Sequence, residues 1–444
     1  MRKYDSYKPT KIEFLDEIPE HWEEKRMRFL GYLYGGLSGK SASDFNQLTN
    51  EANKYFIPFT NIANNFRIDP ESLQTVVISE NENQNSVQKG DIFFLMSSEN
   101  YDDVGKSAVL LDDLEETYLN SFCKGFRITK DDIVPEFLNY QLHSKQLRHN
   151  LLTGANGFTR INLKIDKVID LLTALPTSKE QTAIAAYLDR KTAEIDELIA
   201  DKKRLLELYE EEKTAIINQA VTKGINPNVP LKDSGIEWLG EIPEHWETVS
   251  LKWVSKIYSG GTPSKNNEDF WQNGTIPWLN SGTVNQFFIT EPSEFITEEA
   301  LNSSSAKWIP EYSIVIALAG QGKTKGMAAQ VMFECTCNQS MGVIVPNDII
   351  VNRFLLYYLT RNYQNIRNLG GGDKRDGINL EMVGGIPLPV IPLPEQAEIV
   401  RHIEDHSNLI DAKKAKTEKL IELLTEYRTA LISEVVTGKI KVTD

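Results

Sequence analysis

The stretch Glu13–Trp22, which reads EFLDEIPEHW, returns later in the chain as Glu237–Trp246, which reads EWLGEIPEHW. The shared string EIPEHW is unbroken, and the offset is 224 residues, from position 13 to position 237. A run of six identical residues at this distance is very improbable by chance. The sequence therefore predicts an internal repeat, and the fold has to be read as two copies of one plan.

The ends of the two copies match better than their middles. Glu180-Gln181 returns as Glu395-Gln396, at an offset of 215 that holds without a gap to Ile225 and Ile440. Between the ends only fragments correspond: Ile57-Pro58 with Ile276-Pro277, Gly105 with Gly326, Asn120 with Asn338, and Ile161-Asn162-Leu163 with Ile378-Asn379-Leu380. This pattern predicts a common frame that carries two differently shaped surfaces. An old duplication that has simply drifted is the alternative.

Length and composition limit the possible classes of protein. The 444 residues suggest two or three domains, and 41% hydrophobic residues are enough for sizeable cores. The net charge of −15 argues against a sequence-blind DNA coat, although it allows DNA to be read through local patches. No apolar run reaches the roughly 18 residues of a membrane helix, and no signal peptide is visible. Three cysteines are too few for a disulfide framework, so we expect a reducing cytoplasm.

Each middle is expected to be a mixed α/β domain. Strands are predicted by short β-branched or aromatic runs, and helices by apolar residues at helical spacing. The predicted strands cover 91–96, 126–128, 313–318 and 342–345, the predicted helices cover 135–149 and 352–366, and glycine-rich loops follow at 154–157 and 370–373.

Each copy is predicted to end in a long helix with a seven-residue apolar repeat. Leu188, Ile195, Tyr209 and Ile216 follow this spacing in the first copy. Ile403, Ile410, Leu424 and Leu431 follow it in the second. A lone helix of about 40 residues would expose its apolar stripe to water, so we expect the two helices to pair. The alternative is that each helix merely caps its own domain.

With these features in view, the chain resembles the specificity subunit of a Type I restriction–modification system. The resemblance rests on IPEHW at the start of each copy, on Ile-Pro-Trp-Leu-Asn at 276–280, and on Leu393-Pro394-Glu395-Gln396 at the head of the second long helix. It covers the whole chain, including the order of domains and helices. The first copy departs from the pattern at Pro176-Thr177-Ser178-Lys179, before its own Glu-Gln pair, and at Phe59-Thr60-Asn61, where the second copy has Trp278-Leu279-Asn280.

The resemblance implies an α/β fold with two target recognition domains, 1–177 and 226–391, related by a pseudo-two-fold. It implies two spacer helices, 178–225 and 392–444, that pack antiparallel. It also implies the partners, which are a bipartite double-stranded DNA site, two modification subunits that use S-adenosylmethionine, and restriction subunits that use ATP and magnesium. No cofactor is expected in this chain. Two similar domains on a fixed spacer can read two half-sites about one helical turn apart, roughly 34 Å.

Candidate DNA-binding residues are polar or cationic side chains in loops of the two middles. Arginine and lysine can contact guanine or phosphate, and asparagine and glutamine can pair with adenine. The candidates are Lys40, Asn61, Lys106, Arg160, Lys265, Asn280, Gln321, Lys323, Lys325, Lys374 and Arg375. Each of them could instead be an ordinary loop charge or turn residue.

No catalytic constellation is evident in the sequence. The string Ala317–Thr324 loosely matches a phosphate-binding loop, but the residues after it read as a second strand where such a loop needs a helix. Cys335 and Cys337 lack a companion pair for a metal, and packing is favoured over catalysis for His21 and His245. The leading hypothesis is therefore a non-catalytic DNA-recognition subunit. The open alternatives are a self-sufficient methyltransferase or nuclease with a duplicated DNA-binding half, and a structural adaptor that binds no DNA.

Overall fold

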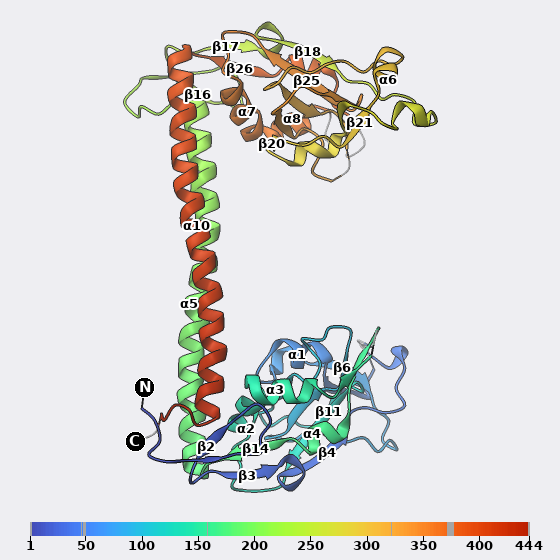
Figure 1. Cartoon of the computed structure of the whole chain (residues 1–444), viewed down its shortest axis with the longest axis vertical. Coiled ribbons are helices and arrows are strands. Elements are labelled where there is room, and N and C mark those ends of the chain that lie inside the picture. Colours follow the sequence, from blue (N-terminus) through green and yellow to red (C-terminus); the bar gives the residue numbers. More distant parts are fainter. Residues whose placement is uncertain are drawn as a thin grey trace. The chain divides into compact units, whose positions relative to one another are not determined.

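The computed structural model describes residues 2–45, 47, 50–157, 159–320, 322–370 and 377–442. The chain forms two compact units. Unit 1 comprises Met1–Lys203 and Glu418–Asp444, and unit 2 comprises Arg204–Thr417. Each unit contains one mixed α/β part and one portion of each of the two long helices, α5 (Ser178–Lys223) and α10 (Leu393–Val436) (Figure 1).

The centre of unit 1 is an antiparallel sheet in the order β4-β11-β7-β9. Its strands are β4 (Gly31–Gly35), β11 (Cys123–Ile128), β7 (Ile92–Leu95) and β9 (Ser107–Val109). Strand β7 reads Ile-Phe-Phe-Leu and is buried on both faces, as a continuous apolar run predicts. A second sheet has β5 (Asn53–Ile57) at its centre, parallel to β10 (Thr117–Leu119) and antiparallel to β6 (Gln74–Val77).

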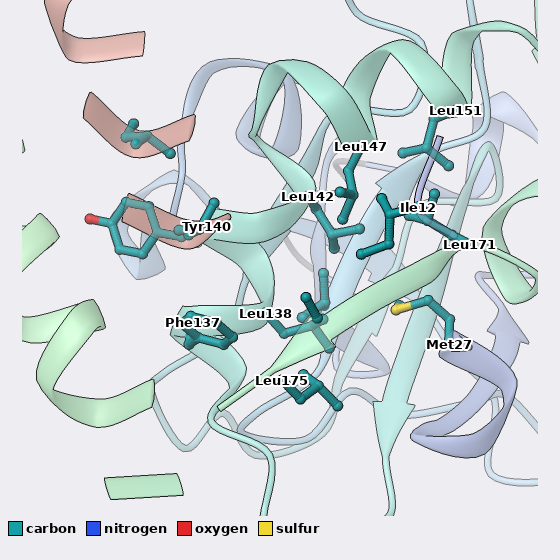
Figure 2. Close-up of a cluster of buried hydrophobic side chains, with 14 of the residues drawn as sticks. Ile12, Met27, Phe137, Leu138, Tyr140, Leu142, Leu147, Leu151, Leu171 and Leu175 are labelled. Atoms are coloured by element: carbon teal, nitrogen blue, oxygen red, sulfur yellow. The ribbon is translucent and has the colours of Figure 1, made fainter. Parts of the chain in front are cut away.

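The helical segment predicted at 135–149 is two helices in the structure, α2 (Pro135–Leu142) and α3 (Lys145–Leu152). The break lies at Ser144, whose backbone is extended and whose Oγ accepts a hydrogen bond from the Leu147 amide at 3.4 Å, which makes it the N-cap of α3. Leu138 and Leu147 belong to one buried cluster with Met27 and Leu171, so both helices cover the same core (Figure 2). The break costs little because both helices keep their apolar faces buried.

Unit 2 repeats the order of the four main-sheet strands and adds a fifth, β20, although its middle shares almost no sequence with that of unit 1. Its main sheet has the order β18-β25-β22-β23-β20, and its second sheet the order β21-β19-β24, in which β19 and β24 are parallel. The strands are β18 (Ser255–Ser259), β19 (Ile276–Leu279), β20 (Phe288–Ile289), β21 (Glu294–Ile296), β22 (Ile314–Ala317), β23 (Ala328–Val331), β24 (Thr336–Cys337) and β25 (Met341–Pro346). The predicted helix at 352–366 is again broken, into α7 (Asn352–Arg361) and α8 (Tyr363–Asn368). The two middles are thus one fold with different surfaces.

Shorter elements complete both units, and only some of them have counterparts in the other unit. In unit 1 they are β1 (Tyr7–Pro9), β2 (Glu17–Pro19), β3 (Glu23–Arg26), α1 (Phe59–Asn64), β8 (Ser97–Ser98), β12 (Ala155–Asn156), β13 (Ile161–Leu163), α4 (Ile165–Ile169) and β14 (Leu172–Leu175). In unit 2 they are β15 (Leu231–Asp233), β16 (Glu241–Pro243), β17 (Glu247–Ser250), α6 (Glu298–Asn302), α9 (Leu380–Gly384) and β26 (Pro387–Val390).

Hydrogen bonds fix the true correspondence between the two middles. The amide of Asn120 donates to the Ile57 carbonyl at 3.1 Å, and the amide of Asn338 donates to the Leu279 carbonyl at 3.0 Å. The pairing of Asn120 with Asn338 is therefore confirmed, and Ile57 corresponds to Leu279. The sequence match of Ile57-Pro58 with Ile276-Pro277 is wrong by three residues, because a short apolar dipeptide recurs easily in strands.

A second fragment match is also out of register. Helix α4 begins at Ile165 and α9 begins at Leu380, an offset of 215 residues. The amide of Leu163 donates to the Met96 carbonyl at 2.8 Å, as the amide of Ile378 does to the Leu318 carbonyl at 2.7 Å. The match of Ile161-Asn162-Leu163 with Ile378-Asn379-Leu380 is therefore wrong by two residues, and the offset of 215 already holds at Leu163.

The two long helices pair in each unit, as their heptads predict. In unit 1 Arg428 of α10 bonds Asp196 of α5, with Nε 2.8 Å from Oδ1. In unit 2 Lys213 of α5 bonds Asp411 of α10, with Nζ 2.8 Å from Oδ2. Apolar residues of both helices share one core in unit 1, among them Leu188, Ile195, Leu431 and Val435. The idea that each helix only caps its own domain is wrong.

Candidate nucleic-acid interface

The repeated Glu-Gln pair lies where each long helix leaves its α/β part. Buried Gln181 accepts a hydrogen bond from the Val134 amide at 2.9 Å and donates to the carbonyls of Asp132 at 3.0 Å and Pro176 at 2.9 Å. Gln396 makes the same three bonds, to the Val351 amide at 2.7 Å and to the carbonyls of Ile349 and Ile391 at 2.8 and 2.9 Å. The glutamine ties the first turn of the long helix to the segment before α2 or α7, using backbone atoms only.

The glutamates of the same pairs bind the repeated His-Trp motif. Glu180 Oε2 lies 2.9 Å from His21 Nε2, and Glu395 Oε2 lies 2.9 Å from His245 Nε2. The second oxygen accepts from the Tyr4 hydroxyl at 2.6 Å in unit 1 and from the Trp246 indole at 3.0 Å in unit 2. These contacts assign the two histidines to packing of the frame, the role that the sequence favoured.

The C-terminal end of the other long helix packs against the same His-Trp motif in each unit. Gly438, just after α10, lies against Pro19 and Trp22, and Gly224, just after α5, lies against Trp246. Both glycines have a left-handed backbone, with φ of 75° and 72°. We call this assembly the joint: the Glu-Gln pair, the His-Trp motif and the glycine of the partner helix. It is built twice from the same residue types.

Three predicted DNA-binding residues point into unit 1. Asn61 is 2% exposed, and its side chain bonds both the amide and the carbonyl of Asp69, at 3.0 and 2.9 Å. Lys106 Nζ is bonded to the Ala63 carbonyl at 3.1 Å and to Asp103 at 2.6 Å. Lys40 lies 2.5 Å from Glu82, and its hydrogen bond lowers the pKa of Glu82 to about 2. Local partners occupy all three, and their arrangement gives no support to base contact.

The predicted hairpin loop of unit 2 is present, but its residues differ in their exposure to solvent. Strands β22 and β23 pair antiparallel on either side of it, so the residues after the loop form a strand and not the helix of a phosphate-binding loop. Lys323 is exposed. Lys325 is only 3% exposed, so the expectation that it points at DNA is corrected: the loop turns its side chain into the protein. Gln321, Lys374 and Arg375 lie outside the described residues.

The remaining candidates are accessible. Lys265 lies over the Trp271 ring, with Nζ 3.4 Å from the ring centroid, and its Nζ is 2.7 Å from Glu294. Asn280 is exposed and caps a short turn by accepting from the Gly282 amide at 2.8 Å. Its structural counterpart in unit 1 is Pro58, which occupies the same cap position, and not Asn61. Asn61 and Asn280 are therefore not equivalent residues.

Arg160 has surroundings that the sequence did not reveal. Its guanidinium carbon lies 4.9 Å from the ring centroid of Phe122, an aromatic residue that is 51% exposed. Both residues line a small pocket together with Phe59, Ser97, Ser98 and Glu99. These four residues and Phe122 come from segments far apart in the sequence, so no local motif could have identified them. Their convergence depends on the strand pairing of unit 1.

A buried ionic network stabilises the sheet beneath these loops. Arg127 of β11 bonds Asp91 through two nitrogens, at 3.0 and 2.7 Å, and the Tyr34 hydroxyl donates to Asp91 at 2.6 Å. Burial and the Asp91 charge raise the pKa of Tyr34 well above its usual range. The hydrogen bonds with Asp91 likewise raise the pKa of Arg127. The network is fully paired and has a structural role.

Among the described residues, no group of three or more histidine, cysteine or carboxylate side chains is placed to bind a metal ion. No helix in the described part of the chain is long and apolar enough to span a membrane.

Comparison with known proteins agrees with this geometry. The type I restriction enzyme EcoR124I/EcoR124II specificity subunit of Escherichia coli is 28% identical over 264 residues, which is 57% of this chain and 59% of that protein. The type I restriction enzyme MjaVIII specificity subunit of Methanocaldococcus jannaschii is 28% identical over 68% of this chain and 70% of its own length.

Two solved structures share the fold over nearly the whole chain. One is a chain from work on complex assembly and conformational transition of the type I R-M system, with a TM-score of 0.71 and 16% identity over 95% of this chain and 99% of that one. The other is the HsdS subunit from Thermoanaerobacter tengcongensis, with a TM-score of 0.61 and 17% identity over 95% and 98%. The family described as the Type I restriction modification DNA specificity domain matches residues 19–208 and 243–423, once for each repeat. The chain belongs to this family.

Proposed function

We propose that the chain is the DNA-recognition subunit of a Type I restriction–modification complex, and that each unit reads one half of a bipartite site. The observation that carries this proposal is the joint, which is built twice from the same residues around two middles with the same topology and different surfaces. A common frame with two different readers is what recognition of two unlike half-sites requires. The subunit contributes recognition, and its partners carry out the chemistry.

The paired helices fit a role in spacing and assembly. Helix α5 has 46 residues and α10 has 44. We propose that the number of residues in these helices determines the spacing of the half-sites. We also propose that their outer faces dock two modification subunits. Leu198, Leu420 and Tyr427 are apolar side chains on these helices that stay exposed in unit 1.

The partners and cofactors follow from this role. The proposed partners are double-stranded DNA, two modification subunits that use S-adenosylmethionine, and restriction subunits that use ATP and magnesium. We propose that all of these cofactors bind in the partner subunits. The cytoplasm is the proposed location, since the three cysteines are free and buried.

A domain exchange tests the proposal. Residues 30–160 would be replaced by the corresponding middle of another family member, and the exchanged chain would be produced with its modification subunits in a host free of DNA methylation. Gln181 binds only backbone atoms of the replaced segment, so the joint should survive the exchange. Mapping of methylated bases across the genome should show a new first half-site and an unchanged second half-site.

The mirror-image exchange, over residues 254–375, serves as the control and should change only the second half-site. If either exchange changed both half-sites, or neither, the modular reading would be wrong. The alternative of a self-sufficient methyltransferase or nuclease gains no support from the family match. It would require the purified chain to methylate or cut DNA without its partners.

A further inference from the structure

A pocket of about 260 Å³ opens on unit 1 beside strand β8. Its lining combines two aromatic rings, two hydroxyl groups, one carboxylate and one guanidinium: Phe59, Phe122, Ser97, Ser98, Glu99 and Arg160. The lining therefore places a cation, an anion and two aromatic rings around one small cavity, and the Phe122 ring is 51% exposed.

Strand pairing and a turn hold the pocket together. Strand β13 pairs with β8, with Ile161 opposite Ser98, so Arg160 lies directly before the residue that faces the serines. Phe122 is fixed by the turn at Asn120, whose Oδ1 accepts from the Phe122 amide at 3.0 Å. The pocket is therefore built from ordered backbone and is not a chance gap between loops.

Within the described part of the chain, three of the four polar side chains of the pocket have no hydrogen-bonding protein partner, whereas Ser98 Oγ accepts a hydrogen bond from the Asn100 amide at 3.1 Å. Among the described residues, no hydrogen bond or ion pair engages the side chains of Arg160 and Glu99, and Ser97 Oγ is buried without a partner. The other cations of unit 1 that were predicted to bind DNA, Lys40 and Lys106, are both engaged by carboxylates. An unpartnered buried hydroxyl beside an unpaired arginine points to a ligand, because buried polar groups normally have partners.

The chemistry of the pocket matches one base pair. In the major groove a guanine presents the two acceptors O6 and N7, which an arginine can bind with two hydrogen bonds, and the paired cytosine presents an amino donor that a glutamate can accept. The Phe122 ring holds the guanidinium plane from one side. We propose that Arg160 and Glu99 read a G·C pair in the half-site of unit 1, with Phe122 as the residue that positions Arg160.

The corresponding place in unit 2 has different chemistry. By the strand register and turn hydrogen bonds, Phe59 corresponds to Ser281 and Phe122 to Ser340, while Ser97 and Ser98 correspond to Ala319 and Gly320. Both aromatic rings are absent there. At the offset of 215 residues, Arg160 corresponds to Arg375, and by the register of Ser97 and Ser98, Glu99 corresponds to Gln321; both counterparts lie outside the described residues. The aromatic support of the arginine is therefore the feature of this reader that belongs to unit 1.

This inference rests on the proposed function, and one experiment separates the two. The full chain with its modification subunits would be supplied with a library of DNA sites in which each base pair of both half-sites is varied in turn, and methylation would be measured for every site. Arg160→Ala, Glu99→Ala and Phe122→Ala would be compared with the parent. Arg28→Ala and Phe29→Ala are the matched controls, since both side chains are exposed and lie outside both the pocket and the long helices.

Arg160→Ala should lower the preference for guanine at one position of the first half-site by roughly 5- to 150-fold, the range for a bidentate base contact. Glu99→Ala should weaken discrimination at the same base pair, and Phe122→Ala should reduce it less. The second half-site should not change, and neither control should alter specificity. Arg160→Lys keeps the charge and loses the planar fork, so it should also relax that position while the salt dependence stays the same.

Three outcomes would overturn the inference: uniform weakening at all sites with Arg160→Ala, which marks a phosphate contact; unchanged specificity; or an effect at a pair other than G·C. If the parent complex itself methylates no bipartite site, the proposed function fails instead. The parent measurement therefore separates the two failures.

Discussion

Replacing the joint glutamine is the sharpest test of how the frame is held together. Gln396→Leu keeps the size of the side chain and removes three hydrogen bonds, to the Val351 amide and to the carbonyls of Ile349 and Ile391. At about 1 kcal/mol net for each bond, the local free energy of unfolding should fall by about 3 kcal/mol. Gln181→Leu should cost the same amount in unit 1, since its three bonds are equivalent.

Hydrogen exchange followed by mass spectrometry suits this test, because a chain with two units need not unfold in one step. With Gln396→Leu, amides at the start of α7 and in the first turns of α10 should exchange about 100-fold faster, which corresponds to about 3 kcal/mol. The joint of unit 1 should be unaffected. Gln219→Leu, at an exposed position of α5, is the matched control. An increase of less than about threefold at Gln396→Leu would refute the view that this residue fastens the helix to its domain.

Three further predictions concern other parts of the chain. Burial lowers the pKa of His143 to about 4, below its unfolded value, so stability should fall as pH drops from about 6.5 towards 4. His143→Gln should remove about 2 kcal/mol of the loss between pH 7 and pH 5, measured by chemical denaturation; an equal loss in the variant would contradict this. Arg127→Met leaves Asp91 buried without its cation and should destabilise unit 1 by about 3–5 kcal/mol in the same assay, whereas less than about 1 kcal/mol would show that the pair matters little. Lys323→Ala should reduce the slope of log affinity for DNA against log salt by about 1, and an unchanged slope would make Lys323 an ordinary solvated charge.

Local periodicity made the long helices predictable. The heptads place Leu188 and Ile195 on a stripe of the first long helix, and Ile403 and Ile410 on a stripe of the second. Apolar stripes of that length must be covered, so both the helices and their pairing follow from the sequence alone. The repeat itself was visible because the joint uses the same residues twice. Glu180 and Gln181 must contact particular atoms, which leaves little freedom for substitution.

The middles were harder to predict because their requirements are looser. A buried strand needs apolar residues and not particular ones, so Ile-Phe-Phe-Leu of β7 and Ile-Val-Ile-Ala of β22 form equivalent strands of two separate sheets without matching in sequence. Where the sequences differ this much, a short chance match such as Ile-Pro gives a wrong alignment. The match of Ile57 with Ile276 is an example, because Ile57 corresponds to Leu279 in the structure. Sheet register is determined by backbone hydrogen bonds, which leave no mark in a single sequence.

The candidate site shows the same limit in another form. Lysine in a loop signals a solvated charge, yet tertiary structure brings Glu82 to Lys40 and the Ala63 carbonyl to Lys106. Lys325 is turned inwards. The pocket around Arg160 could not be predicted for the opposite reason, since Phe122 and Ser97 carry no signal of their own in the sequence. They form a candidate site only because the fold brings them to the same pocket.

The region just after the second long helix carries one more consequence. Lys441 donates its amide to the Arg2 carbonyl at 2.9 Å, and the Tyr7 hydroxyl donates to the Gly438 carbonyl at 3.1 Å. In unit 2 the corresponding passage, from Gly224 to Leu231, is made by uninterrupted chain. Residues 2–7 and 438–441 thus lie side by side at the place in unit 1 that corresponds to the linker of unit 2. A gene rearranged to join position 442 to position 2 and to start within the segment 226–230 would therefore encode the same two units in the opposite order.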